Sequence, residues 1–274
     1  MSGLLDEMAR TSRVRCDQAM SRESLDDLRA RCADVAPGPR LKLDGRFDLI
    51  AEVKLSTPSE GTLAVPPGDR AGFVQAAARR YAAAGAAAVS VLTEPLRFGG
   101  CLDDLAAVAS VLDVPAMRKD FLVDAYQIWE ARAVRAGGAL LIARMLDDRT
   151  MGSMLEAAAE AGLFVLLEAF DADDLARCRH VAAAWSHDVP LLVGVNTRDL
   201  VTLAVDPERL GHLASHLPSE VPCVAESGMK TPQDTARVQR QGYRLGLVGS
   251  ALMRAADPGE LATGMLASAR GTCS

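Results

Sequence analysis

Ionisable side chains interrupt the apolar segments of this sequence close to their C-terminal ends. The first such segment, residues 48–54, reads D-L-I-A-E-V-K, so Glu52 and Lys54 lie two residues apart. In an extended strand, side chains two residues apart point to the same face. A carboxylate and an ammonium group on a buried face are costly unless they pair or function together. This pair is therefore a candidate for binding an anion and for transferring protons.

Later apolar segments end with residues of similar type. The polar side chains at these ends are Lys119, Glu168, Asn196, Arg198, Glu226 and Ser227. Both signs of charge are present, which suits a substrate that carries carboxylate and phosphate groups and undergoes proton transfer. For any single residue, an ion network without chemistry remains the alternative. Asp120 and Asp199 each follow a cationic residue at such an end, and we expect them to form outward-facing ion pairs.

The last two segments carry residues suited to phosphate binding. Gly228 and Gly249 allow the backbone to approach an anion closely. Ser250 begins S-A-L-M-R, a sequence that could open a short extra helix whose N–H groups face a phosphate. Plain turn formation is the alternative role for these glycines.

The segments that carry these residues alternate with stretches of helical periodicity. The eight apolar segments are residues 48–54, 87–93, 115–121, 139–145, 164–170, 191–196, 222–228 and 245–251. Eight alternations of strand and helix predict an α/β fold, a (β/α)8 TIM barrel with its functional residues at the C-terminal strand ends. An open doubly wound sheet is the rival, but the first segment runs into K-L-S-T-P-S-E-G without a G-x-G-x-x-G turn.

An N-terminal extension precedes the first strand. Residues 3–17 and 21–33 have helical patterns, and a proline- and glycine-containing link follows them. Because the extension has few apolar residues, we expect residues 1–47 to pack on the barrel of residues 48–274. The chain is then a single domain overall, which is a common size for such barrels.

Composition narrows the class of protein. Of the 274 residues, 49% are apolar and only 4% aromatic, and acidic residues exceed basic ones by 36 to 30. No run of five Lys or Arg residues and no apolar run of 18 residues occurs, so we expect neither nucleic-acid binding nor membrane insertion. The six cysteines form no C-x-x-C pair, and with no signal peptide this predicts reduced thiols in the cytoplasm. The predicted state is a monomer or a weak homo-oligomer.

Two other groups of residues could in principle carry chemistry. His212 and His216 have the spacing of a helical metal pair, but no acid accompanies them as in H-E-x-x-H. A solvated helix face is the better interpretation, and no metal site is predicted. Cys101 follows F-G-G with no histidine near it in sequence, which favours a small residue at the barrel rim over a nucleophile.

The motifs resemble the indole-3-glycerol-phosphate synthase family. The matching segments are I-A-E-V-K and P-S-E-G (50–61), S-V-L-T-E (90–94), R-K-D-F-L-V (118–123), L-L-E (166–168), G-V-N-T-R-D-L (194–200), A-E-S-G (225–228) and V-G-S-A-L-M (248–253). They follow the family's order along nearly the whole chain. The resemblance implies a carbon–carbon lyase of tryptophan biosynthesis that needs no cofactor or metal. Its substrate would be the phosphorylated small molecule 1-(2-carboxyphenylamino)-1-deoxyribulose 5-phosphate, and its products indole-3-glycerol phosphate, CO₂ and water.

The resemblance also implies a role for each matching position. Lys119 would be the general acid for ring closure and Glu168 the general base. Lys54 would hold the substrate carboxylate and donate a proton in the later dehydration, with Glu52 and Asn196 orienting the lysines and the sugar hydroxyls. Substrate-binding residues would be Arg198, Glu226, Ser227, Pro58, Phe98 and Phe121, and phosphate-binding residues Thr57, Gly228, Gly249 and Ser250. Lys119, partly desolvated beside other cations, should lose its proton more readily than a free lysine.

Two departures from the family pattern keep alternatives open. Thr57 stands where the family has the first serine of S-P-S, and R-A-G-G-A (135–139) stands where it reads G-A-D-A-V. Such drift also suits a paralogue serving secondary metabolism. A sugar-phosphate isomerase on the same barrel would need a Cys or Asp acid–base pair at the first and sixth strands, which this chain lacks. A catalytically silent barrel is the third alternative, and it gives no reason to keep Lys54, Lys119 and Glu168.

Overall fold

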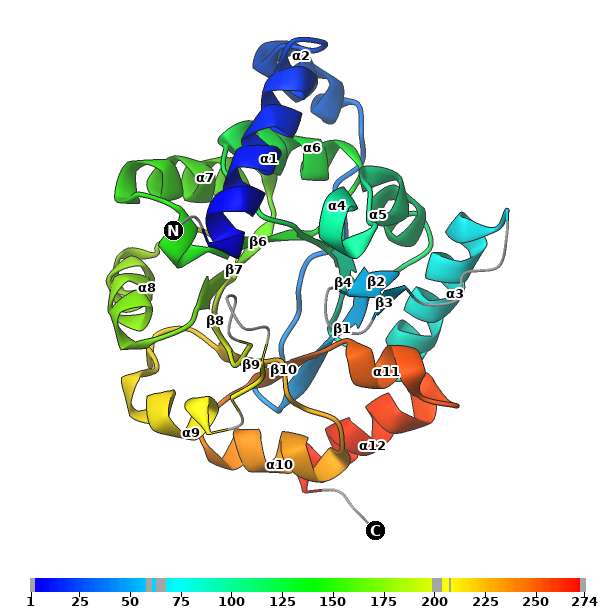
Figure 1. Cartoon of the computed structure of the whole chain (residues 1–274), viewed down its shortest axis with the longest axis vertical. Helices are drawn as coiled ribbons and strands as arrows, with labels where there is room; N and C mark the ends of the chain where they lie inside the picture. Colours follow the sequence, from blue (N-terminus) through cyan, green and yellow to red (C-terminus); the bar gives the residue numbers. More distant parts are fainter. Residues whose placement is uncertain (1–2, 58–60, 63–67, 199–203, 207, 272–274) are drawn as a thin grey trace.

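Eight parallel strands close into a barrel in the computed structural model, which describes residues 3–57, 61–62, 68–198, 204–206 and 208–271 (Figure 1). The strands are β1 (Asp48–Val53), β4 (Ala88–Leu92), β5 (Ala116–Lys119), β6 (Gly138–Ile142), β7 (Phe164–Ala169), β8 (Leu191–Asn196), β9 (Cys223–Glu226) and β10 (Leu245–Val248). They pair in the order β1-β10-β9-β8-β7-β6-β5-β4, and β1 also pairs with β4. The predicted (β/α)8 barrel is confirmed.

Helices surround the barrel and follow the strands along the chain. They are α3 (Arg70–Ala83), α4 (Pro95–Phe98), α5 (Leu102–Ala109), α6 (Ala125–Ala133), α7 (Asp148–Ala161), α8 (Ala172–Ala184), α9 (Arg209–Leu213), α10 (Pro232–Arg240), α11 (Ser250–Arg254) and α12 (Pro258–Arg270). A short antiparallel pair, β2 (Ser56–Thr57) and β3 (Gly61–Thr62), follows β1, and 3₁₀ turns occupy Ala143–Met145 and Ala214–His216. None of the described helices is long and apolar enough to cross a membrane.

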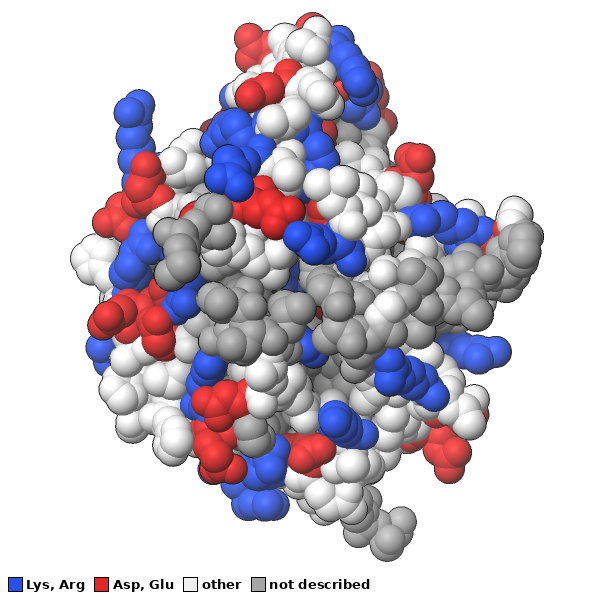
Figure 2. Space-filling model, in the orientation of Figure 1, with Lys and Arg blue, Asp and Glu red and all other residues white. Residues whose placement is uncertain are grey.

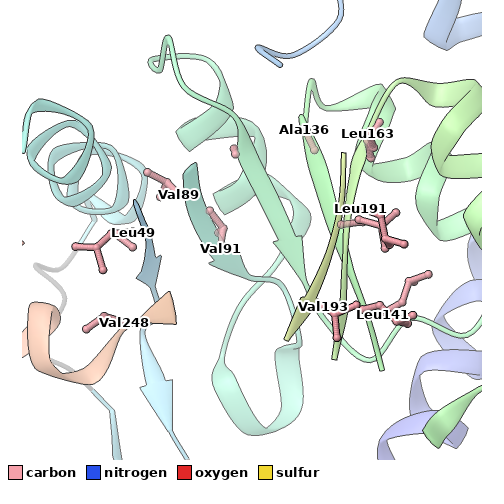
Figure 3. Packing of buried hydrophobic residues seen from close by; sticks show 14 of the residues in the cluster. Leu49, Val89, Val91, Ala136, Leu141, Leu163, Leu191, Val193 and Val248 are labelled. Atoms are coloured by element: carbon pink, nitrogen blue, oxygen red, sulfur yellow. The ribbon is translucent and has the colours of Figure 1, made fainter. Parts of the chain in front are cut away.

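Each strand alternates between the barrel interior and the surrounding helices. Leu49, Val89 and Val193 point outward into the layer between the strands and the helices (Figure 3). Ile50, Met117, Leu166 and other residues of opposite parity pack with one another inside the barrel. The period of two therefore decides which later side chains face inward. Glu52, Lys119 and Glu168 have the inward parity and continue these interior rows towards the C-terminal ends.

Apart from β8, whose bounds match the prediction, the observed strands end before the predicted segments do. The eighth segment was predicted to extend over residues 245–251, but β10 ends at Val248. Gly249 leaves the extended conformation with φ −125° and ψ −75°, and α11 begins at Ser250. The short extra helix expected from S-A-L-M-R is thus present. The fourth segment likewise gives way to a 3₁₀ turn after Ile142.

Arg135 occupies a backbone conformation that glycine adopts more readily. Its φ of 64° lies in the left-handed region, which costs a residue with a Cβ atom roughly 1 kcal/mol. The family pattern that the sequence resembles has glycine at this position. Gly138, three residues on, has no room for a side chain, because a Cβ atom there would lie 2.3 Å from the Phe164 ring. The altered segment therefore changes a helix–strand connection at the end remote from the polar strand ends.

The N-terminal extension forms two helices, α1 (Leu4–Met20) and α2 (Leu25–Ala33), which lie beside α6 in Figure 1. Met8 of α1 is buried and packs with Phe121, near the C-terminal ends of the strands. Arg15 donates two hydrogen bonds to the buried carboxylate of Asp120, at 2.9 and 2.8 Å. The extension therefore contacts the segment that directly follows Lys119.

Candidate active site

A cavity of about 940 Å³ opens at the C-terminal ends of the barrel strands. The predicted residues that line it are Glu52, Lys54, Phe98, Lys119, Phe121, Glu168, Asn196, Arg198, Glu226, Ser227, Gly228, Gly249 and Ser250. Pro58 and the side chain of Thr57 lie outside the described part of the chain. Acidic and basic side chains are interspersed over this face of the molecule (Figure 2). Residues from seven strand ends and their adjoining loops thus meet in one cavity.

Glu52 and Lys54 form an ion pair inside the cavity, with 2.9 Å between Lys54 Nζ and Glu52 Oε1. Burial opposes the charged form of Glu52, but Lys54 and Lys119 outweigh it and lower the pKa of the Glu52 carboxyl group. Gly249 makes this arrangement possible, because a Cβ atom there would lie 2.4 Å from Glu52 Oε1 and 3.0 Å from Lys54 Nζ. The expected shared face of Glu52 and Lys54 is confirmed.

Lys119 lies among carboxyl groups. Its Nζ is 3.3 Å from Glu168 Oε2 and 3.9 Å from Glu226 Oε2. Burial would lower the pKa of Lys119, but the carboxyl groups around it, Glu168 foremost, outweigh burial and raise the pKa above its ordinary value. The expectation of a lysine beside other cations, with a lowered pKa, was wrong. This shift favours the protonated form of Lys119 at neutral pH.

Two aromatic rings form an apolar wall of the cavity. The centroids of Phe98 and Phe121 are 6.2 Å apart, and the rings are tilted by 35°. Phe98 ends α4, whose N-terminal amides donate to the buried carboxylate of Glu94. The amide of Phe121 donates to Asp120 Oδ1 at 2.8 Å. Both rings are thus held by buried carboxylates and can pack against a planar aromatic substrate.

Asn196 and Ser227 form a hydrogen-bonded pair at the ends of β8 and β9. Ser227 Oγ donates to Asn196 Oδ1 at 2.8 Å, and the amide of Arg198 donates to the same oxygen at 2.9 Å. Ser227 has φ 67°, in the left-handed region, and Gly228 follows with φ 80°. Strained backbone of this kind is found at functional sites, where the surrounding contacts must hold it. Ser227 and Gly228 line the same cavity as Ser250, the first residue of α11.

Asp120 is paired, as predicted, and it also lines part of the cavity. It is buried rather than solvated, beneath Arg15 of α1, and Thr93 Oγ1 donates to it at 2.8 Å. Arg118 lies 3.5 Å from the same carboxylate. Asp199, for which the same role was predicted, lies outside the described residues.

Sequence reasoning missed several residues that shape the cavity. Leu92, Leu140 and Ile142 line it, and their inward parity on the predicted strands could have identified them. Gly194 lies in the middle of β8, and a Cβ atom there would be 2.0 Å from Glu226 Oε1. A glycine inside a strand signals a close approach, and here it makes room for a carboxyl group.

The other candidate residues lie elsewhere. His212 is on α9 and His216 ends a separate 3₁₀ turn, so the two do not share one continuous helix. Within the described ranges, no three His, Cys, Asp or Glu side chains are grouped as metal ligands. Cys101 is half-buried at the N-terminus of α5.

The barrel and its cavity define a TIM-barrel enzyme with paired acidic and basic groups, an aromatic wall and a glycine-containing strand-end turn. A family model described as indole-3-glycerol phosphate synthase matches residues 5–263. The indole-3-glycerol phosphate synthase of a Nocardioides species is 44% identical over 93% of this chain and 95% of its own length. A Streptomyces coelicolor relative, indole-3-glycerol phosphate synthase 1, is 39% identical over 93% of this chain and 91% of its own.

The chain therefore belongs to the indole-3-glycerol phosphate synthase family. It is a decarboxylating carbon–carbon lyase of tryptophan biosynthesis. Among solved structures, 3-hexulose-6-phosphate synthase from Salmonella typhimurium aligns with a TM-score of 0.60 at 17% identity, covering 83% of this chain and all of that one. This last likeness shows the shared barrel fold alone.

Proposed function

We propose that the cavity closes the indole ring of 1-(2-carboxyphenylamino)-1-deoxyribulose 5-phosphate, with Lys119 as general acid. The observation that carries this assignment is the position of the Lys119 ammonium group. It lies inside the barrel, 3.3 Å from Glu168, in the cavity that Phe98 and Phe121 also line. A substrate ring packed on these aromatic side chains places its ketone in the polar part of the cavity. Lys119 then protonates the ketone oxygen as the ring carbon attacks.

Lys54 and Glu168 take the later proton transfers in this proposal. Lys54 holds the substrate carboxylate until it leaves as CO₂, and then protonates the departing hydroxyl group. Glu168 removes the carbon-bound proton that must leave when water is lost. Because Glu168 lies 3.3 Å from Lys119, this proton can return to Lys119. One further proton per turnover comes from solvent, which balances the loss of the carboxylate as neutral CO₂.

The phosphate of the substrate is proposed to bind at the other side of the cavity. Gly228, Gly249 and Ser250 present backbone amides there, and Thr57 takes the place of the family's serine. Asn196, Arg198, Glu226 and Ser227 contact the sugar in this proposal, Pro58 adds to the aromatic subsite, and Glu52 holds Lys54 in place. The common location of the described residues among them around one cavity supports these roles. We also propose that a monomer or weak homo-oligomer works in the cytoplasm on this small molecule, without cofactor, metal, nucleic acid or membrane.

The test of this function is an assay of the purified chain with the proposed substrate. Indole fluorescence should appear together with one equivalent of CO₂. Release of neither product by the folded protein, or isomerisation of an aminoaldose phosphate instead, would overturn the proposal. A paralogue with altered substrate tolerance would be recognised by a higher kcat/KM with a ring-substituted substrate.

We further propose that residues 1–47 and the barrel of residues 48–274 form one cooperative unit, joined through Arg15. Its guanidinium group donates to Asp120, whose side chain is fully buried. Arg15→Ala leaves this carboxylate with fewer partners, and we expect it to lower the free energy of unfolding by about 2–3 kcal/mol. Urea unfolding followed by circular dichroism measures this loss, and the transition should remain single.

Arg13→Ala is the matched control, because it removes the same side chain from the same helix. Arg13 pairs with Asp124, and both side chains are partly exposed, by 45% and 28%. Such pairs contribute less than about 1 kcal/mol. Arg13 also donates to the Val123 carbonyl oxygen at 2.6 Å. Equal effects of the two substitutions, or separate unfolding transitions for the extension and the barrel, would contradict the proposal.

A further inference from the structure

Glu226 is the most deeply buried acid of the cavity, with 1% of its surface exposed. No described residue donates a hydrogen bond to either of its carboxyl oxygens. The carboxyl group of Glu168, two strands away on β7, is its near neighbour, because both groups lie within 3.9 Å of Lys119 Nζ. Gly194 leaves the space that Glu226 Oε1 occupies. Two carboxylates cannot hydrogen-bond each other unless one of them carries a proton.

The two lysines of the cavity cannot pair closely with all three of its glutamates if every one is ionised. Lys54 from the β1 end lies 2.9 Å from Glu52, and Lys119 from β5 lies 3.3 Å from Glu168 of β7. Glu226 is only a distant second partner of Lys119, at 3.9 Å. Three carboxyl groups thus share two lysines, and each lysine is closer to another acid.

The remaining elements packed against Glu226 do not change this balance. Asn196 lies beside Glu226 on β8, and Leu247 lies beside it on β10. Neither side chain carries a charge. Arg198, beyond the end of β8, is a nearby cation whose charge acts on Glu52. The acid without a close cation of its own is therefore Glu226.

Keeping a carboxylate ionised and buried without a close cation costs several kcal/mol, and taking up a proton avoids that cost. Burial and, after it, the charge of Glu168 raise the pKa of Glu226 well above its ordinary value. The same proton supplies the hydrogen bond that both carboxyl groups otherwise lack. The raised pKa of Glu226 thus agrees with its lack of a close cation.

We infer that Glu226 is a neutral carboxylic acid in the resting enzyme and that its O–H group donates a hydrogen bond to the Glu168 carboxylate. This inference rests on the proposed function, in which Glu168 is the base. Glu226 is then a positioning residue. It fixes the orientation of the base, and because it is uncharged it leaves Lys119 with a single close anion. Gly194 contributes to this arrangement, because the absence of a side chain there leaves room for the Glu226 carboxyl group.

Infrared spectroscopy of the full chain without substrate tests the protonation state directly. The wild-type minus Glu226→Gln difference spectrum at neutral pH should contain the C=O band of a carboxylic acid, shifted in D₂O. Glu52→Gln is the matched control, because Glu52 is paired with Lys54 in the same cavity, and its difference spectrum should contain carboxylate bands alone. A carboxylate signature for Glu226 at neutral pH would overturn the inference.

A second measurement needs no variant. Carbon-13 NMR of wild-type protein labelled in its glutamate carboxyl carbons should contain one signal that keeps the chemical shift of an acid at neutral pH. That signal should move only on titration to alkaline pH. If every glutamate signal has reached its carboxylate position by neutral pH, the inference fails even if Glu226→Gln does not fold.

The pH dependence of kcat/KM tests the positioning role. Loss of the Glu226 proton at high pH breaks its hydrogen bond to Glu168, so the wild-type value should fall about tenfold per pH unit there. In Glu226→Gln the amide cannot titrate. Whatever the maximal kcat/KM of this variant, its kcat/KM should therefore change less than about threefold over the same alkaline pH range. An unchanged alkaline limb in this variant would overturn the role. The two spectra do not depend on turnover, so they stand even if the proposed reaction is absent.

Discussion

Replacing Lys119 by alanine is expected to lower kcat by about a hundred- to ten-thousand-fold, while KM stays within a few-fold of its wild-type value. The ketone oxygen loses its proton donor at the moment when negative charge develops on it. Binding persists because the proposed aromatic and phosphate subsites do not involve this side chain. Steady-state indole fluorescence gives kcat and KM, and displacement of a bound product analogue checks binding.

Two further variants separate proton donation from charge and from general damage. Lys119→Arg keeps the positive charge, but a guanidinium group does not give up its proton near neutral pH. It should therefore be nearly as slow as the alanine variant, and recovery of most activity would show that charge alone suffices. Lys42→Ala, at an exposed lysine of the link before β1, should turn over like the wild type. A wild-type kcat in Lys119→Ala would rule out the general-acid role.

The fold and the location of the site could be predicted because they depend on period and order along the chain. Alternating strand and helix patterns defined the barrel, and the parity of each strand decided which side chains face inward. Glu52 was placed correctly by parity, and Lys119 by its position at the end of a predicted strand. Parity is a local property, and burial of both strand faces enforces it in the folded protein.

The environment of Lys119 could not be predicted in the same way. Its neighbours Glu168 and Glu226 come from β7, two strands from β5, and from β9, which lies opposite β5 in the barrel. Which side chains meet inside depends on barrel closure, strand stagger and side-chain length, and no segment of sequence encodes these separately. The sequence indicated that both signs of charge were present. Their pairing, and hence the direction of the Lys119 pKa shift, required the three-dimensional arrangement.

The ion pair of Arg15 is a second feature that could not be predicted from the sequence. Nothing in the helical pattern of residues 3–17 distinguishes Arg15 from Arg13, yet one pairs with a buried acid and the other with a partly exposed one. The difference arises from how α1 docks on the barrel. Gly194, in contrast, carried a signal in the sequence, because a glycine in the middle of a predicted strand indicates a close approach.

Replacing Glu168 by glutamine is expected to lower kcat by about a hundred-fold or more, because the amide cannot accept the proton lost in the dehydration. Glutamine has nearly the same size, so the barrel should keep its stability. If proton removal becomes the slow step, substrate deuterated at sugar carbon 1 should react with a larger isotope effect than in the wild type. Glu130→Gln is the matched control, since Glu130 pairs with Arg118 at 3.0 Å and does not line the cavity. An unchanged kcat in Glu168→Gln would remove Glu168 from the role of base.

The same variant also separates the two halves of the reaction. Loss of the Glu168 charge removes the closest anion from Lys119, which weakens the stabilisation of its ammonium group and makes it a stronger acid. Ring closure and CO₂ release should therefore remain fast in Glu168→Gln, while dehydration becomes slow. Rapid-quench experiments should detect a burst of CO₂ that precedes indole formation. If CO₂ and indole appear together at the same slow rate, Glu168 acts in ring closure instead, where its contact with Lys119 would hold the acid in position.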